Sequence, residues 1–190
     1  MVLAAGESKR MNFPKMLLLL NGRTMIETVI EKISESQVDK IMVVTGAYRD
    51  EIEEAAGNFQ IQLCHNEKYK DGMLSSVKCA FRSIPAEARQ VLVFPGDKPL
   101  ITPEVINLLI DACKREKKGI IIPVYQGKRG HPILIDMKYR DEITRLAPEE
   151  GLRSLARHFQ DDVLEVETGD PGVINDIDTY DDYVRLVNQT

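Results

Sequence analysis

Short apolar runs alternate along the whole chain with stretches in which apolar residues recur at helical spacing. The apolar runs cover residues 1–5, 41–45, 61–65, 91–94, 120–122, 133–135 and 163–166. The stretches with helical spacing cover residues 25–33, 51–56, 73–81, 105–113 and 180–187. Strands that are joined through helices run parallel, because a parallel pair needs a long crossover connection. The pattern therefore predicts an α/β fold with a mostly parallel central sheet.

Three helix starts are marked by residues that cap helices. Residues 24–27, Thr-Met-Ile-Glu, form a capping-box pattern. Thr102 stands before Pro103, which suits the first position of a helix. Thr179 and Asp182 mark the start of the last helix in a similar way.

The composition is that of an ordinary globular domain, with 43% hydrophobic and 29% charged residues. No linker-like segment divides the 190 residues, so we expect one domain over residues 1–190. The net charge of −5 disfavours nucleic acid and anionic membranes as partners. The longest aliphatic run, residues 16–20, is far shorter than the roughly 20 residues that span a bilayer. Charges from Glu7 onward interrupt any signal peptide. We therefore expect a cytoplasmic location.

Polar residues gather directly after the apolar runs, where open α/β sheets bind their ligands. These segments are residues 6–15, 66–76, 95–99, 127–132 and 175–178. The functional residues are expected among them.

The first of these segments suits a phosphate ligand. Gly6 lets a ligand approach the backbone N–H groups, Arg10 can bind a phosphate with two hydrogen bonds, and Lys15 adds a point charge. The loop contains neither GxxxxGK[ST] nor GxGxxG, which disfavours a P-loop NTPase and a classical dehydrogenase. A solvated surface loop is the alternative interpretation of the same residues.

Three aspartates suit a magnesium site. Asp97 directly follows the apolar run 91–94, and Asp176 and Asp178 lie two residues apart, on one face of an extended segment. Mg²⁺ is usually held by one or two protein carboxylates together with phosphate oxygens and waters. A Gly-Asp turn at Asp97 and helix capping by Asp178 or Thr179 are the structural alternatives.

Five motifs together resemble the nucleotidyltransferases of the molybdenum-cofactor type. LAAGESKRMNFPK is similar to the opening motif LAAGxSxRMGxxK of this family, with Lys15 at the matching position and Asn12 in place of a glycine. Residues 96–99, GDKP, resemble the GDxP metal motif. Residues 175–183 resemble a closing DIDTPEDY-like motif, with Tyr180 in place of proline. GKRGHP at 127–132 resembles a GxxGHP segment on the acceptor side.

The fifth motif consists of Asn66 and residues 72–76, and the resemblance as a whole spans residues 3–183. It implies a Rossmann-like three-layer sandwich of the nucleotide-diphospho-sugar transferase type. It also implies Mg²⁺ as the cofactor, held by Asp97 with Asp176 or Asp178, of which Asp176 is preferred. Arg10 would then bind the β- and γ-phosphates, and Lys15 the transferred phosphoryl group.

The remaining site residues follow from the same resemblance. The nucleotide would be bound by Leu3, Ala4, Ala5, Gly6, Asn66, Gly72, Ser75 and Ser76. The acceptor would be bound by Gly130, His131 and Pro132. Each polar residue has a structural alternative as well, since a serine at a helix start often caps the helix and a histidine beside proline can fix a turn.

The implied reaction is the transfer of CMP from CTP to molybdopterin, with release of pyrophosphate. CTP is favoured because Ala5 resembles the cytidylyl branch, whereas members that transfer GMP usually carry glycine there. The methyl group of Ala5 would narrow the space for the nucleobase, so that a pyrimidine fits better than a purine. The alternatives are transfer to a sugar phosphate or alcohol phosphate, a nucleotide-binding module without catalysis, and an oxidoreductase. The resemblance further implies contact with a molybdoenzyme or its chaperone.

Overall fold

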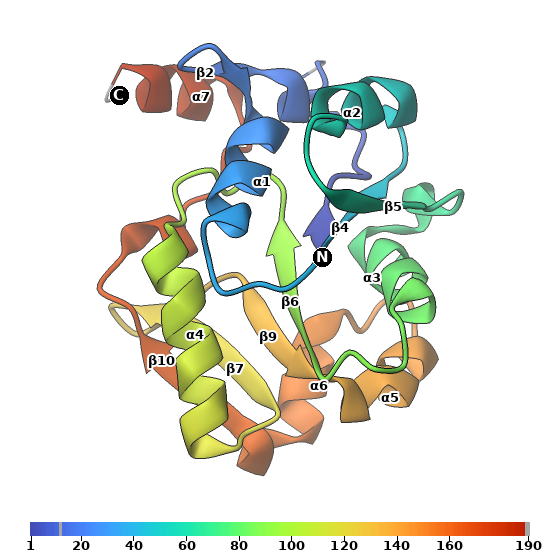
Figure 1. Cartoon of the computed structure of the whole chain (residues 1–190), viewed down its shortest axis with the longest axis vertical. Helices are drawn as coiled ribbons and strands as arrows, with labels where there is room; N and C mark the ends of the chain where they lie inside the picture. Colours follow the sequence, from blue (N-terminus) through green and yellow to red (C-terminus); the bar gives the residue numbers. More distant parts are fainter. Residues whose placement is uncertain (12, 189–190) are drawn as a thin grey trace.

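The central sheet carries helices on both of its faces (Figure 1). The computed structural model describes residues 1–11 and 13–188, so Asn12 lies outside the described residues. The strand order is β10-β7-β9-β6-β1-β4-β5, and β8 pairs with β7. The strands of this sheet are β1 (Val2–Leu3), β4 (Ile41–Thr45), β5 (Ile61–His65), β6 (Gln90–Pro95), β7 (Ile120–Tyr125), β8 (Lys128–Arg129), β9 (Ile133–Asp136) and β10 (Val163–Glu167).

Most neighbouring strands are parallel, as the alternation of strand and helix patterns predicts. The pairs β1–β4, β1–β6, β4–β5 and β7–β10 are parallel, whereas β9 runs antiparallel to β6 and β7 and β8 runs antiparallel to β7. Every residue of β4 is buried, which is typical of a parallel strand covered on both faces. The predicted α/β class and the mostly parallel sheet are therefore confirmed.

The helices form two layers, one on each face of the sheet (Figure 1). One apolar cluster joins the sheet to α1 (Met25–Ser34), α2 (Arg49–Ala56) and α4 (Pro103–Glu116). A second cluster joins it to α3 (Met73–Ser83), α5 (Arg140–Arg145) and α6 (Leu152–His158). Val2 and Ala4 belong to the first cluster and Leu3 and Ala5 to the second, because successive side chains of an extended segment point to opposite faces.

The last helix, α7 (Tyr180–Val187), lies beside a small hairpin rather than on a face of the sheet (Figure 1). The hairpin consists of β2 (Leu19–Leu20) and β3 (Arg23–Thr24). Ile177 and Leu186 pack on Met25, and the hydroxyl of Tyr183 donates to the carbonyl of Leu19 at 2.8 Å. The segment just before α7 is thereby attached to the start of α1.

Short 3-10 helices connect several elements. They are η1 (Lys15–Leu17), η2 (Tyr69–Asp71), η3 (Met137–Tyr139), η4 (Gln160–Asp162) and η5 (Pro171–Val173). The predicted capping boxes of α1 and α7 are both formed: Thr24 accepts from the backbone N–H of Glu27, and Thr179 from that of Asp182. Among the described residues, no helix combines the length and apolarity needed to cross a membrane.

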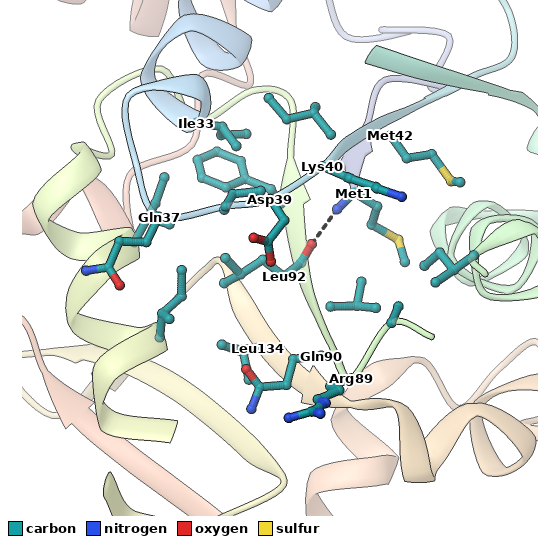
Figure 2. Close-up of a pocket in the computed structure, with 18 of the residues that line it drawn as sticks. Met1, Ile33, Gln37, Asp39, Lys40, Met42, Arg89, Gln90, Leu92 and Leu134 are labelled. Atoms are coloured by element: carbon teal, nitrogen blue, oxygen red, sulfur yellow. Dashed lines mark hydrogen bonds between the residues drawn. The ribbon is translucent and has the colours of Figure 1, made fainter. Parts of the chain in front are cut away.

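A cavity of about 700 Å³ lies at the amino ends of β1, β4 and β6 (Figure 2). Its lining includes Lys40, Gln90 and Leu92, and the amino group of Met1 donates to the carbonyl of Leu92 at 2.7 Å. Burial lowers the pKa of this amino group to about 5. The predicted functional residues follow the carboxyl ends of the strands, so the cavity is separate from them.

Candidate active site

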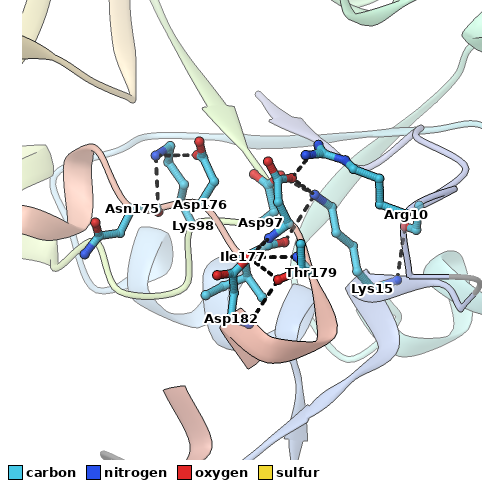
Figure 3. A network of polar contacts seen from close by, with 11 residues as sticks. Arg10, Lys15, Asp97, Lys98, Asn175, Asp176, Ile177, Thr179 and Asp182 are labelled. Atoms are coloured by element: carbon cyan, nitrogen blue, oxygen red, sulfur yellow. Dashed lines mark hydrogen bonds and ion pairs between the residues drawn. The ribbon is translucent and has the colours of Figure 1, made fainter. Parts of the chain in front are cut away.

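Four charged side chains from three distant parts of the sequence meet beyond the carboxyl end of β6 (Figure 3). Lys15, the first residue of η1, places its Nζ 2.5 Å from Oδ2 of Asp97 and 3.1 Å from Oδ1 of Asp178. Arg10 reaches the same oxygen of Asp178 at 2.9 Å from the solvent side. All four residues were predicted as site residues, and the fold brings them together.

The backbone around Asp97 is held by close packing of strand ends. The N–H of Gly96 donates to the carbonyl of Leu3 at 3.0 Å. A Cβ at Gly96 would lie 2.9 Å from the sulfur of Met16 and 3.0 Å from the carbonyl oxygen of Leu3, so a side chain there would require these neighbours to move. The N–H of Ile177 donates to the carbonyl of Asp97 at 3.3 Å, which attaches the closing motif to the end of β6.

Asp176 does not join the group around Lys15. Its Oδ1 lies 2.7 Å from Nζ of Lys98, a side chain that is only 2% exposed. The resemblance to the nucleotidyltransferases implied Asp176 or Asp178 as the second metal ligand, with Asp176 preferred. The segment between β10 and α7 is not a strand, and its two carboxylates diverge to different lysines.

The predicted acceptor segment lies near Asp97, Lys98 and Asp176, whose charges act on His131. The backbone N–H of His131 donates to the carbonyl of Val173 at 2.9 Å, and a Cβ at Gly130 would lie 2.3 Å from that same oxygen. The peptide bond between His131 and Pro132 is cis. Burial, and next the charge of Lys98, lower the pKa of His131, which favours a neutral imidazole.

The opening loop offers backbone rather than side chains to a ligand. Leu3, Ala4 and Ala5 are buried in the core, and Gly6 is exposed. A Cβ at Gly6 would meet no atom within 4 Å, so the packing does not demand glycine there. The methyl group of Ala5 packs in the second apolar cluster.

The polar residues of the segment 66–76 hydrogen-bond mainly to one another. Nδ2 of Asn66 donates to the hydroxyls of Ser75 at 2.8 Å and Ser76 at 3.0 Å, and its Oδ1 accepts from the N–H of Lys68 at 3.0 Å. Gly72 has φ +92°, a conformation that favours glycine. The side chains thus fix the loop on the start of α3.

Comparison with known sequences identifies the family. The sequence model of the MobA-like NTP transferase domain matches residues 1–163. The chain belongs to this family. The match ends at the first residue of β10 and covers every strand before it, the opening loop, Asp97 and His131.

Several known proteins are similar to this MobA-like domain. The bifunctional protein GlmU of Francisella tularensis subsp. novicida is 28% identical over 171 residues. That alignment covers 88% of this chain, which spans only 36% of the length of GlmU. Rv0371c of Mycobacterium tuberculosis H37Rv has a TM-score of 0.87 at 26% identity, over 98% of this chain and 95% of Rv0371c. A structure of Rv0371c in complex with manganese, at 24% identity, has a TM-score of 0.84 over 100% and 97% of the two chains.

One carboxylate oxygen of the MobA-like domain is suited to bind a divalent metal. Oδ1 of Asp97 and Nδ1 of His131 are the buried side-chain N or O atoms without a hydrogen-bond partner among the described residues. Within the same residues, no three His, Cys, Asp or Glu side chains are grouped closely enough to hold a metal alone. Mg²⁺ needs only one or two carboxylates when phosphate oxygens complete its shell, so the residues fit this ion.

Sequence reasoning missed two residues that shape the site of this MobA-like domain. Gly46 follows β4, and a Cβ there would lie 2.5 Å from the carbonyl oxygen of Ala5 and 2.8 Å from Cβ of Tyr69. Its position directly after an apolar run was the available signal. Lys98 was seen only as the variable residue of GDxP, and no local pattern indicates that it pairs with Asp176.

Proposed function

We propose that this protein transfers a nucleoside monophosphate from an NTP to a phosphorylated acceptor, and specifically CMP from CTP to molybdopterin. The observation that carries the proposal is the position of Lys15 between Asp97 and Asp178, beyond the carboxyl end of β6. This edge is where open α/β sheets bind nucleotides. Membership of the MobA-like family supports the reaction class.

The reaction requires positioning and charge neutralisation rather than a strong base. An oxygen of the acceptor phosphate forms a bond to the α-phosphorus of the NTP. The bond from this phosphorus to the bridging oxygen breaks, and its electron pair leaves with pyrophosphate. Because the acceptor phosphate is already an anion at neutral pH, no residue has to remove a proton from it. Cations that stabilise the developing charge are the main requirement.

We assign a divalent metal, Mg²⁺, to Asp97 and Asp178, with Asp176 left to Lys98. The buried free oxygen Oδ1 of Asp97 supports this assignment, as does the manganese complex of Rv0371c. When bound, the metal would neutralise charge on the triphosphate and orient it.

The other roles are assigned from position and charge. Lys15 interacts with the transferred phosphoryl group, and the exposed Arg10 with the β- and γ-phosphates. The backbone around Gly6 binds the nucleotide, because the space beside Gly6 is open. Asn66 acts indirectly by fixing the loop before α3, together with Gly72, Ser75 and Ser76.

His131 faces the acceptor in this proposal, together with Gly130 and Pro132. Its Nδ1 is buried without a partner among the described residues, so it can bond with a ligand. We also propose that the chain is one domain, because Ile177 and Leu186, beyond the part matched by the family, pack on Met25.

The test is pyrophosphate release with CTP, GTP or ATP, each with and without molybdopterin and with Mg²⁺. The proposal expects release that requires molybdopterin and is fastest with CTP. Release with a sugar phosphate or alcohol phosphate instead would support the alternative acceptors. A thermal shift with NTP but no release with any acceptor would indicate a binding module.

A further inference from the structure

Lys98 is a charged side chain that is almost fully buried beside the candidate active site. It is 2% exposed and directly follows Asp97. Its Nζ lies 2.7 Å from Oδ1 of Asp176 and donates to the carbonyls of Val173 at 3.1 Å and Asn175 at 3.2 Å. An ammonium group has three N–H donors, so these three acceptors satisfy it completely. The proposed transfer chemistry gives Lys98 no task.

All three acceptors of Lys98 lie on residues 173–176, just before Asp178. Figure 3 shows those on Asn175 and Asp176. The next residue, Ile177, is bonded through its N–H to the carbonyl of Asp97. The closing motif is therefore attached to the end of β6 at two points, one through the side chain of Lys98 and one through the backbone. The position of the Asp178 carboxylate follows from both attachments.

The same carbonyl of Val173 also accepts from the backbone N–H of His131 at 2.9 Å. Lys98 and His131 thus share one acceptor on one segment. A change in the position of this segment would move Asp178 and the acceptor loop together. Lys98 therefore links the segment before Asp178 to the predicted acceptor segment, residues 127–132.

We propose that Lys98 is a positioning residue, which holds residues 173–176 against β6 and so sets the separation of the Asp97 and Asp178 carboxylates. The inference rests on the proposed function for its effect on turnover. Its claim about the carboxylates can be measured without turnover. Because Asp176 is half exposed, its carboxylate can remain hydrated without Lys98. Loss of the ammonium group should therefore change the position of residues 173–176 more than the free energy of unfolding.

The decisive variant is Lys98→Met, which keeps an unbranched side chain one atom shorter than lysine and removes its donors. Lys98→Gln retains donors for the two carbonyls and should lie between Lys98→Met and the wild type. Lys32→Met is the matched control, because Nζ of Lys32 donates to the carbonyl of Pro99, close to the same strand end, without contacting residues 173–176.

The binding of Mn²⁺, alone and with CTP, is measured by electron paramagnetic resonance, and pyrophosphate release is measured in parallel. We expect Lys98→Met to weaken Mn²⁺ binding and turnover about 10- to 100-fold, the usual range for residues that orient metal ligands. Lys32→Met should stay within about twofold of the wild type, or roughly 0.5 kcal/mol, because Lys32 has no hydrogen bond or ion pair with residues 173–176 or with Asp97 and Asp178 among the described contacts. Loss of a nearby positive charge alone would strengthen Mn²⁺ binding, so weaker binding separates positioning from simple electrostatics.

Unchanged or stronger Mn²⁺ binding by Lys98→Met, with its fold verified by circular dichroism, would overturn the inference. If Lys98→Met does not fold, Lys98→Gln decides by the same criterion. A wild-type protein that releases no pyrophosphate with any NTP would refute the proposed function instead, and the Mn²⁺ comparison would still decide the role of Lys98.

Discussion

The ammonium group of Lys15 lies 2.5 Å from a carboxylate oxygen of Asp97, although 82 positions separate the two residues in the sequence. Both side chains are largely buried, with 14% and 18% of their surface exposed. A buried pair of this kind is weak evidence for a purely stabilising role, because desolvation offsets much of the attraction. Together with Asp178, it fits the phosphate site proposed above better than a purely structural role.

Asp178 and Asp176 are expected to differ in function. Asp178→Asn should reduce metal-dependent turnover by several orders of magnitude, because this carboxylate faces Lys15 and Asp97. Asp176→Asn should stay within about tenfold of the wild type, since the amide oxygen can still accept from Lys98. Steady-state pyrophosphate release by the two variants tests this. Equal losses, or a larger loss in Asp176→Asn, would restore the preference drawn from the sequence.

Lys15→Ala should slow transfer more than it weakens NTP binding, because the charge on the phosphoryl group changes most in the transition state. We expect a loss of about 10²- to 10³-fold in kcat, as for removal of a preorganised donor. The matched control is Lys9→Ala, since Lys9 belongs to the same loop but is exposed and contacts only Glu7 among the described ion pairs. If kcat and NTP affinity of Lys15→Ala both stay within about twofold, less than roughly 0.5 kcal/mol, the loop is not catalytic.

His131→Ala should raise the KM for the acceptor and leave NTP affinity nearly unchanged. The reason is that its loop is bonded to residue Val173 rather than to the opening loop. Initial rates at varied acceptor and varied NTP concentrations separate the two effects. Weaker NTP binding with an intact acceptor KM would contradict the assignment to the acceptor.

The stability of the protein should depend on pH through His131. Its pKa is lowered from 6.5 in the folded state, mainly by burial, so the unfolded chain binds the proton more readily. Burial of the neutral imidazole therefore costs no protonation free energy above about pH 6.5. The free energy of unfolding decreases as the pH falls below that value. Urea unfolding at pH 7.5 and 5.5 should show a smaller acid loss for His131→Gln than for the wild type. The exposed His158→Gln should behave like the wild type.

Local sequence patterns were sufficient to predict a mostly parallel sheet and the marked helix starts. They also indicated that polar residues of interest follow the strands. The capping boxes at Thr24 and Thr179 are properties of four consecutive residues, and β4 is a continuous apolar run. The partner of each aspartate could not be predicted in this way. Asp176 and Asp178 look equivalent in the sequence, and they differ because Lys98 and Lys15 approach the segment from distant parts of the chain.

The antiparallel direction of β9 could not be predicted from the local sequence either. Its residues form an apolar run like those of the parallel strands, and the direction of a strand depends on the connection that precedes it. The short hairpin of β7 and β8 supplies that connection and brings His131 toward Lys98. The position of the predicted acceptor segment, residues 127–132, near Asp97 therefore follows from topology rather than from its own sequence.

The role of Asp97 in metal-dependent transfer is tested by measuring pyrophosphate release by the wild type and by Asp97→Asn, with CTP, molybdopterin and Mg²⁺. Asp97→Asn should fold, because the amide is similar in shape to the carboxylate and Lys15 keeps Asp178 as a partner. We expect release by the wild type and a loss of several orders of magnitude in the variant. Release at the wild-type rate by Asp97→Asn, with its fold confirmed by circular dichroism, would contradict this role of Asp97.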